Sequence, residues 1–319
     1  MIKIQQNTGI TSCIGNTPLI RLNRLICPSS ILLYGKMEMF NPGGSIKDRT
    51  AFNILKNAID KGLIHSGTTI IESTSGNMGI GLARVCHFLG LPLLLVTDPH
   101  INELTISILK AFNAQIITVK KDDGNGGYLK TRLEKVQQLL KKNPNSFWPD
   151  QYHNMDNPSA HEQTFMEIQN SLGKFPDYIF VSTSTCGTLR GLGDAIDKSN
   201  AHTKIIAVDA VGSVIFGDKP KKRCIPGMGA SRSSNFLLIN QVEDVVLVSD
   251  KESIEGCHHL LSAESILAGG SSGAIVTAIE KKLPEIPENS TVVAIFADNG
   301  ERYLKTIYSE KWVQQHFKE

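Results

Sequence analysis

A single lysine follows a glycine turn in the segment 41–49, which reads Asn-Pro-Gly-Gly-Ser-Ile-Lys-Asp-Arg. Ser45 and Asp48 are spaced as the partners of a helix capping box, and apolar residues recur at helical spacing after them. Lys47 is therefore expected in the first helical turn, where the helix dipole disfavours a cation by about 0.3–1 kcal/mol. That penalty is far too small to give a neutral amine at neutral pH. A covalent imine with an aldehyde cofactor would remove the charge, as in many catalytic lysines; the alternative is a solvated surface lysine.

A second glycine segment, 72–81, reads Glu-Ser-Thr-Ser-Gly-Asn-Met-Gly-Ile-Gly. It comes after a short apolar run and before a helical pattern, so it is expected to connect a strand to a helix. Such a loop directs backbone N–H groups at an anion. Its spacing is G-x-x-G-x-G, whereas dinucleotide-binding folds have G-x-G-x-x-G, and the dinucleotide fingerprint is therefore not met.

Two further loops offer hydroxyl groups at the start of a helix. Residues 182–188, Ser-Thr-Ser-Thr-Cys-Gly-Thr, form a candidate phosphate cradle, and an ordinary helix cap is the alternative. Residues 269–273, Gly-Gly-Ser-Ser-Gly, place Ser271 or Ser272 where a hydroxyl could bond a ring nitrogen. A lysine, a phosphate cradle and a hydroxyl for a ring nitrogen are what pyridoxal phosphate requires. Because a hydroxyl does not keep that nitrogen protonated, elimination and replacement at the β-carbon are favoured over transamination.

Strand-like apolar runs alternate with amphipathic helical stretches, which predicts an α/β architecture with largely parallel sheets. The expected strands are 31–37, 69–72, 92–97, 115–119, 178–182, 204–209, 245–249 and 291–296. The expected helices are 46–61, 78–89, 103–112, 127–142, 158–172, 187–198, 251–261 and 271–282. Lys47 and each of the three loops therefore lie at the start of an expected helix.

These motifs resemble the cysteine synthase and cystathionine β-synthase family of fold type II pyridoxal-phosphate enzymes. The likeness runs from Gly15 to Tyr303, and its most specific segments are 41–49, 73–79 and 269–274. It implies a two-lobed fold similar to the tryptophan synthase β subunit, a homodimer, and pyridoxal 5'-phosphate in the cleft. By this likeness Lys47 holds the cofactor, Asn77 bonds its ring hydroxyl, and Ser271 meets its ring nitrogen.

The same likeness assigns the remaining contacts to two loops. The phosphate loop of the family, G-T-G-G-T, is matched by Ser184, Thr185, Cys186, Gly187 and Thr188. The substrate α-carboxylate is gripped by the loop that holds Thr74, Ser75 and Asn77. In terms of lobes, residues 38–148 are expected as a smaller, mobile N-terminal lobe that carries Lys47 and the carboxylate loop. Residues 1–37 and 149–319 are expected as the larger lobe, which carries the phosphate loop and the ring-nitrogen serine.

The chain departs from ordinary cysteine synthases at several site positions. Ser73 replaces a proline, Met78 a threonine, Ser184 and Cys186 replace glycines, and Tyr152 replaces a phenylalanine. Segments 212–220 and 226–232 also differ. These departures resemble the N-(2-amino-2-carboxyethyl)-L-glutamate synthases of the staphyloferrin B pathway. Such transferases join O-phospho-L-serine to L-glutamate, release phosphate, and supply a precursor of 2,3-diaminopropionate for a siderophore.

The resemblance makes small amino acids the expected partners, and four side chains are candidates for binding them besides Ser73 and the carboxylate loop. A phosphate dianion suits a guanidinium fork, so Arg132 and Arg232 are candidates for the phosphate or for the carboxylates of glutamate, with a surface arginine as the alternative. Tyr152 and Ser184 are expected in the substrate pocket. A cysteine synthase that uses sulfide and a non-catalytic binding protein are the alternative functions.

Composition excludes several other classes. The 319 residues are 41% hydrophobic with a formal net charge of +2, and scattered basic residues give no case for nucleic acid or a membrane surface. The cysteines are widely spread, which suits a reducing cytoplasm and predicts neither disulfides nor a zinc site: Cys13, Cys27, Cys86, Cys186, Cys224 and Cys257. Cys257, His258 and His259 are adjacent and would point apart on a helix, so no metal site is expected.

Overall fold

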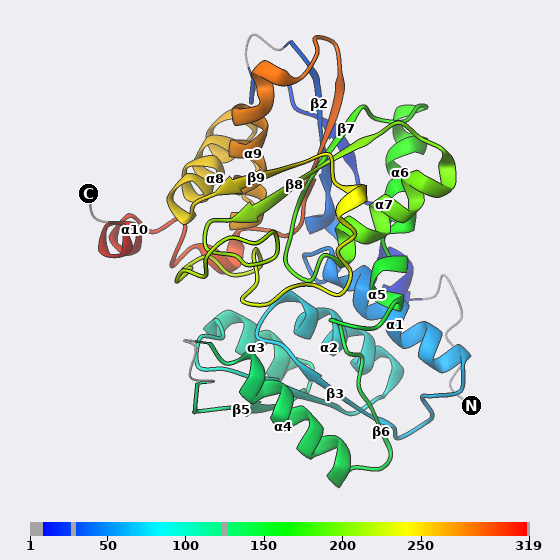
Figure 1. Cartoon of the computed structure of the whole chain (residues 1–319). Coiled ribbons are helices and arrows are strands. Elements are labelled where there is room, and N and C mark those ends of the chain that lie inside the picture. The colour runs from blue at the N-terminus through cyan, green and yellow to red at the C-terminus, as the bar shows by residue number, and fades with distance from the viewer. Residues whose placement is uncertain (1–8, 27–29, 123–126, 318–319) are drawn as a thin grey trace. The chain divides into compact units, whose positions relative to one another are not determined.

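The computed structural model describes residues 9–26, 30–122 and 127–317 (Figure 1). Contacts divide the chain into two compact units. Unit 1 comprises Met1–Gly15 and Asn41–Ala160, and unit 2 comprises Asn16–Phe40 and His161–Glu319. Cys27 lies outside the described residues.

Unit 1 is built on a parallel four-stranded sheet with the order β5-β4-β3-β6. Its strands are β3 (Thr69–Ser73), β4 (Leu93–Thr97), β5 (Gln115–Thr118) and β6 (Ser146–Phe147). Its helices are α1 (Lys47–Asp60), α2 (Asn77–Leu89), α3 (Glu103–Ala111), α4 (Leu129–Lys142) and α5 (Asp156–Ser159). Neighbouring side chains of β3 enter different cores: Ile70 packs with α1 and α2, whereas Ile71 packs with Val136 of α4. Helices therefore cover both faces of this sheet.

Unit 2 is built on a six-stranded sheet with the order β1-β2-β10-β7-β8-β9. Only β1 runs antiparallel to its neighbour among the described strands. The strands are β1 (Leu19–Arg21), β2 (Leu32–Met37), β7 (Tyr178–Ser182), β8 (Lys204–Ala210), β9 (Asp244–Val248) and β10 (Thr291–Phe296). The helices are α6 (Glu162–Leu172), α7 (Gly187–Ser199), α8 (Asp250–Glu264), α9 (Gly270–Lys282) and α10 (Glu310–His316). Figure 1 shows α8 and α9 on one side of this sheet and α6 and α7 on the other.

Short 3-10 helices complete the described elements: η1 (Gly9–Cys13), η2 (Glu38–Phe40), η3 (Ile239–Gln241), η4 (Leu283–Glu285) and η5 (Glu301–Tyr303). The α/β class with largely parallel sheets is confirmed, and each expected strand is present. The helix expected over 158–172 was wrong at its start, because a short α5 precedes an α6 that begins at Glu162. Pro158 lies in the first turn of α5, where a proline is tolerated.

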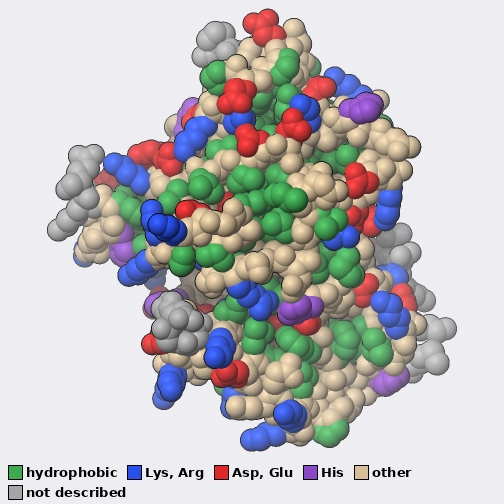
Figure 2. All heavy atoms as spheres, viewed as in Figure 1, with side chains coloured by type: hydrophobic (Ala, Val, Ile, Leu, Met, Phe, Trp, Pro, Cys, Tyr) green, Lys and Arg blue, Asp and Glu red, His purple; other side chains and the backbone are tan. Residues whose placement is uncertain are grey.

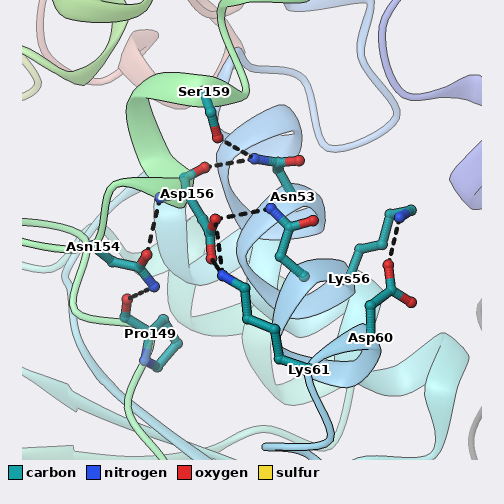
Figure 3. Close-up of polar contacts among 9 residues, drawn as sticks. Asn53, Lys56, Asp60, Lys61, Pro149, Asn154, Asp156 and Ser159 are labelled. Carbon is teal, nitrogen blue, oxygen red and sulfur yellow. Dashed lines mark hydrogen bonds and ion pairs between the residues drawn. The ribbon is translucent and has the colours of Figure 1, made fainter.

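The segment 149–160 packs onto α1, and Figure 3 shows the polar contacts that hold it. Asn53 Nδ2 donates to the backbone oxygen of Asp156 at 2.7 Å and to Ser159 Oγ at 2.9 Å. Asn57 Nδ2 donates to Asp156 Oδ1 at 2.9 Å, and Lys61 Nζ lies 3.2 Å from Asp156 Oδ2. The sequence placed this segment with the larger lobe, whereas its contacts place it in unit 1. The functional roles of the two lobes stay a prediction.

Charged residues of both signs are interspersed on the molecular face shown in Figure 2. Among the described residues, no helix combines the length and the apolar character needed to cross a membrane.

Candidate active site

The glycine turn before Lys47 is closed by its own backbone and by Asp48. Gly44 has φ +76°, in the left-handed region that favours glycine, and its N–H donates to Asn41 O at 2.8 Å. The N–H of Gly43 donates to the Asp48 carboxylate, and a Cβ at Gly43 would overlap that carboxylate. The turn therefore favours glycine at both positions, and it delivers the chain to Lys47, the first residue of α1.

The expected capping box between Ser45 and Asp48 was wrong. The N-cap of α1 is Ile46, whose side chain offers no acceptor, and Ser45 Oγ instead accepts the N–H of Lys47 at 3.3 Å. Asp48 is turned back to the N–H of Gly43, because the tight turn presents that donor to it. The placement of Lys47 in the first helical turn is confirmed.

The glycines of the segment 76–81 allow close packing around the start of α2. A Cβ at Gly79 would lie 3.1 Å from Thr74 Cγ2, and a Cβ at Gly81 would lie 3.0 Å from the backbone oxygen of Lys47. Helix α2 therefore approaches α1 closely within one turn of Asn77, its first residue. Lys47 and Asn77 thus begin two helices that pack against each other.

Ser75 is held by a charged pair from other parts of unit 1. Its hydroxyl donates to Asp98 Oδ2 at 2.7 Å and accepts from Arg132 Nη1 at 2.9 Å. The same Arg132 nitrogen lies 3.1 Å from Asp98 Oδ2. Arg132 Nε is buried and has no hydrogen-bond partner among the described residues. The structure therefore brings the candidate Arg132 directly to the loop of Thr74 and Ser75.

Glu72, immediately before this loop, is a buried acid that the sequence reasoning did not select. Its Oε1 accepts from the N–H of Ser73 at 2.7 Å and from Trp148 Nε1 at 3.1 Å, and its Oε2 accepts from the N–H of Gln151 at 3.2 Å. Burial raises the pKa of Glu72 from 4.5 to about 7, against the opposing effect of these donors. The sequence did contain a signal for it, because Glu72 is an acid that directly follows two isoleucines in a strand expected to be buried.

Ser73 and the turn that carries Tyr152 are linked through Gln151. Gln151 Nε2 donates to the backbone oxygen of Ser73 at 3.1 Å, and Ser73 Oγ is buried without a partner among the described residues. Asn157 Nδ2 donates to the backbone oxygen of Gln151 at 2.6 Å, and Thr50 Oγ1 of α1 donates to Asn157 Oδ1 at 3.4 Å. Tyr152, half-buried beside Gln151, therefore sits on a turn that is bonded both to the carboxylate loop and to α1.

In unit 2, the hydroxyl-rich loop connects β7 to the N-terminus of α7. Cys186 is the N-cap with φ +63°, a left-handed conformation that accounts for the glycine of the resembled motif. Thr185 Oγ1 accepts the N–H of Gly187 at 3.3 Å, and Thr188 Oγ1 lies 3.4 Å from His161 Nε2. A loop of this kind, at the start of a helix of 13 residues, can bind an anion such as phosphate.

The segment 212–236 is fastened to this loop. Ser184 Oγ donates to Gly229 O at 3.4 Å, and Ser234 Oγ donates to the backbone oxygen of Thr185 at 2.5 Å. Buried Cys186 packs with apolar side chains of the same segment. Arg232 lies on this segment between the two contacts and is partly exposed.

Ser271 and Ser272 lie in the first turn of α9, which packs against α8 at very short range. A Cβ at Gly256 of α8 or at Gly273 of α9 would overlap the backbone of the other helix. Both serines are buried, and Ser272 Oγ has no hydrogen-bond partner in the described part of the chain. Ser271 is the more exposed of the two, at 6%.

The adjacent residues Cys257, His258 and His259 reach separate partners. Cys257 Sγ lies 3.4 Å from Gly269 O, His258 Nε2 lies 3.1 Å from Ile307 O, and His259 Nδ1 lies 2.7 Å from a Glu280 oxygen. Within residues 9–26, 30–122 and 127–317, no group of three or more acid, cysteine or histidine side chains is arranged to hold a metal ion.

Comparisons with known proteins match almost the whole chain to pyridoxal-phosphate enzymes and related synthases. The family model described as pyridoxal-phosphate dependent enzyme matches residues 10–298. The N-(2-amino-2-carboxyethyl)-L-glutamate synthase of Ralstonia nicotianae is 42% identical over 306 residues, which cover 96% of this chain and 90% of that protein. A solved O-ureido-L-serine synthase has a TM-score of 0.87 at 29% identity and covers 97% of this chain and 96% of its own. The O-acetylserine dependent cystathionine β-synthase from Helicobacter pylori has a TM-score of 0.87 at 30% identity, with 97% and 100% covered.

Proposed function

Because the chain belongs to the family of pyridoxal-phosphate dependent enzymes, we propose that it joins O-phospho-L-serine to the amino group of L-glutamate. The resemblance to the cysteine synthase and cystathionine β-synthase family is confirmed, and the protein is an enzyme whose cofactor is pyridoxal phosphate. In the proposed reaction the bond between the β-carbon and the phosphate oxygen breaks. A bond forms between that carbon and the glutamate nitrogen, which releases a proton. The product is N-(2-amino-2-carboxyethyl)-L-glutamate, and the relative of 42% identity named for this compound carries the proposal.

The residues of the two units fit pyridoxal phosphate by the chemistry of their donors. An amine at the start of α1 suits the aldehyde, and the N-terminus of α7 with its hydroxyls suits the phosphate. Ser272 Oγ at the start of α9 is buried without a partner among the described residues, and this supports a hydroxyl donor at that helix start. The proposed ligands are Lys47, Asn77, Ser184, Thr185, Cys186, Gly187, Thr188 and Ser271. When bound, pyridoxal phosphate supplies an electron sink that stabilises negative charge on the substrate Cα.

Lys47 is the catalytic residue of this proposal. Its amine removes the Cα proton of the bound amino acid and returns a proton to the same carbon after the new bond has formed. The close packing of α2 at Gly81 supports a fixed backbone at Lys47, and a fixed backbone limits the positions from which the amine can reach Cα.

The substrate α-carboxylate is bound by the loop that leads into α2. The helix start favours an anion because its first N–H groups have no partner inside the helix. The proposed ligands are Ser73, Thr74, Ser75 and Asn77. The hydrogen bonds that Asp98 and Arg132 form with Ser75 support this assignment, because they hold the loop in one position.

Four further residues are proposed for the variable parts of the two substrates. Arg132 and Arg232 bind the phosphate or the carboxylates of glutamate, since guanidinium groups match both anions. Arg132 Nε is buried without a partner among the described residues and can donate to such an anion. Tyr152 and Ser184 are proposed to contact the substrates, and they replace less polar or smaller residues of sulfide-using relatives.

The proposal extends to assembly and pathway. The enzyme forms a homodimer, which the mass of the purified protein in solution tests directly. Its product is a precursor of 2,3-diaminopropionate, and the reaction serves siderophore biosynthesis.

The deciding experiment supplies O-phosphoserine to the purified enzyme together with either glutamate or sulfide. Release of phosphate with glutamate, and a product of the corresponding mass, is the expected result. Release with sulfide alone would identify a cysteine synthase. No release with either, together with no visible absorption from a lysine-bound cofactor, would identify a binding protein, and the Lys47→Ala variant is the control.

A further inference from the structure

Glu72 joins three separate segments of unit 1 through one buried carboxylate. Its donors are the N–H of Ser73 at the end of β3, the indole Nε1 of Trp148 just after β6, and the N–H of Gln151. Glu72 and Ser73 are fully buried. The Glu72 carboxylate therefore sets the distance between Ser73, where the carboxylate loop begins, and the turn of Tyr152.

Both carboxylate oxygens are used as acceptors, so the geometry fits the ionised form. A proton on either oxygen would turn an acceptor into a donor that faces an N–H group, and at least one of the three bonds would be lost. Asp150 is a charged neighbour that raises the pKa of Glu72, and Asp150 is itself paired with His153 at 2.8 Å. The other charged residues at this end of unit 1 follow β4 or lie near the starts of the helices: Lys47, Asp48, Arg49, Asp98 and Arg132.

We propose that Glu72, in its ionised form, is a positioning residue that holds Ser73 and the Tyr152 turn in the arrangement that binds the amino-acid substrate. This inference rests on the proposed function, in which Ser73 and Tyr152 contact substrate. Gln151 completes the arrangement, because its side chain donates to the backbone oxygen of Ser73 while its own N–H donates to Glu72. Glu72 acts through these residues.

Substrate binding then depends on pH near neutrality. Burial raises the pKa of Glu72 to about 7, so at pH 6 roughly one molecule in ten has the ionised form. If only that form binds, the KM for O-phosphoserine is about tenfold higher at pH 6 than at pH 8 through Glu72 alone. The turnover number at saturation changes less, since bound substrate favours the ionised form.

The chain provides a reporter for the protonation of Glu72. Trp148 and Trp312 are its two tryptophans, and Trp312 lies on α10 in unit 2. In a Trp312→Phe holoenzyme, the emission of Trp148 is expected to titrate with a midpoint near pH 7. Adding Glu72→Gln should abolish that titration; a titration that persists in the double variant overturns the assignment of the proton to Glu72.

The pH dependence of the KM for O-phosphoserine distinguishes a positioning role of Glu72 from a merely structural one. The ratio of the KM at pH 6 to the KM at pH 8 is expected to be about tenfold larger for the wild type than for Glu72→Gln, because the substrate's own ionisation is common to both. Equal ratios overturn the proposal. Should Glu72→Gln fail to fold, Trp148→Phe removes one donor and should move the midpoint of the KM profile up by about one pH unit. An unchanged midpoint likewise overturns it.

Binding of O-phosphoserine alone, followed by the absorption of the bound cofactor, gives the same ratio without turnover. An enzyme that binds O-phosphoserine with the expected pH dependence but never transfers it to glutamate refutes the proposed function and supports the role of Glu72. An enzyme that forms the product with a pH dependence unchanged by Glu72→Gln supports the proposed function and refutes the role of Glu72.

Discussion

Replacing Glu72 by glutamine is expected to change how the free energy of unfolding depends on pH. In the folded chain burial raises the pKa of Glu72 to about 7, whereas the unfolded chain retains the ordinary value of 4.5. The folded state therefore binds this proton more tightly. The stability that Glu72 contributes is fully present below pH 4.5 and is lost as the pH rises through 7.

The size of the effect follows from the two pKa values. Each unit of difference corresponds to about 1.4 kcal/mol, so the whole contribution of Glu72 is about 3 kcal/mol. Most of it, about 2–3 kcal/mol, should disappear between pH 5 and pH 8. Glutamine has no proton to lose, so the stability of Glu72→Gln relative to the wild type should rise by that amount over this interval.

Urea unfolding of both proteins at pH 5, 6, 7 and 8 measures this difference, with the emission of Trp148 reporting on unit 1 in a Trp312→Phe background. Other titrating groups are common to both chains and cancel in the comparison. Glu301→Gln, the same substitution at an exposed glutamate of unit 2, is the matched control. A change smaller than about 0.5 kcal/mol between pH 5 and pH 8 would refute the argument from burial.

Three other substitutions test the site in unit 1. Lys47→Ala should lower turnover by at least about 10³-fold and remove the absorption of the lysine-bound cofactor, while urea unfolding stays close to wild type; retained turnover would contradict the role of Lys47. Gly81→Ala should lower the free energy of unfolding by about 1–3 kcal/mol, because its Cβ would lie 3.0 Å from the Lys47 backbone oxygen; unchanged unfolding would show that α1 and α2 can separate freely. Arg132→Lys keeps the charge near Asp98 but loses the planar fork, so the KM for O-phosphoserine should rise about tenfold, and an unchanged KM would argue against Arg132 as a ligand.

The fold was predictable where burial leaves a pattern in the sequence. Every residue of β10 is buried, and a central strand covered on both faces reads as a continuous apolar run. β1 and β6 have three and two residues, too few to show a period, and were not predicted. The capping box failed for a related reason: spacing alone pointed Asp48 to the N–H of Ser45, whereas the folded turn presents the N–H of Gly43 to it.

The candidate site was predictable where its chemistry is local. Lys47 and the loops at helix starts are visible because turn, hydroxyl and glycine residues stand together in the sequence. The contacts that organise them join distant positions. Ser75 meets Arg132 across 57 positions, and Glu72 meets Gln151 across 79. No periodicity encodes such pairs, so the role of Glu72 emerged only from the three-dimensional arrangement.

The register of β2 has a consequence for the order in which a growing chain can fold. β2 pairs with β1 close by and, on its other side, with β10, so Leu32 lies opposite Thr291. At about 5–20 residues per second, β2 waits roughly 13–50 s on the ribosome for that partner. Residues 41–160 supply the whole sheet of unit 1 in the meantime. Until β10 is synthesised, the edge of β2 that pairs with it lacks that partner, and an unpaired strand edge favours chaperone binding or mispairing between nascent chains.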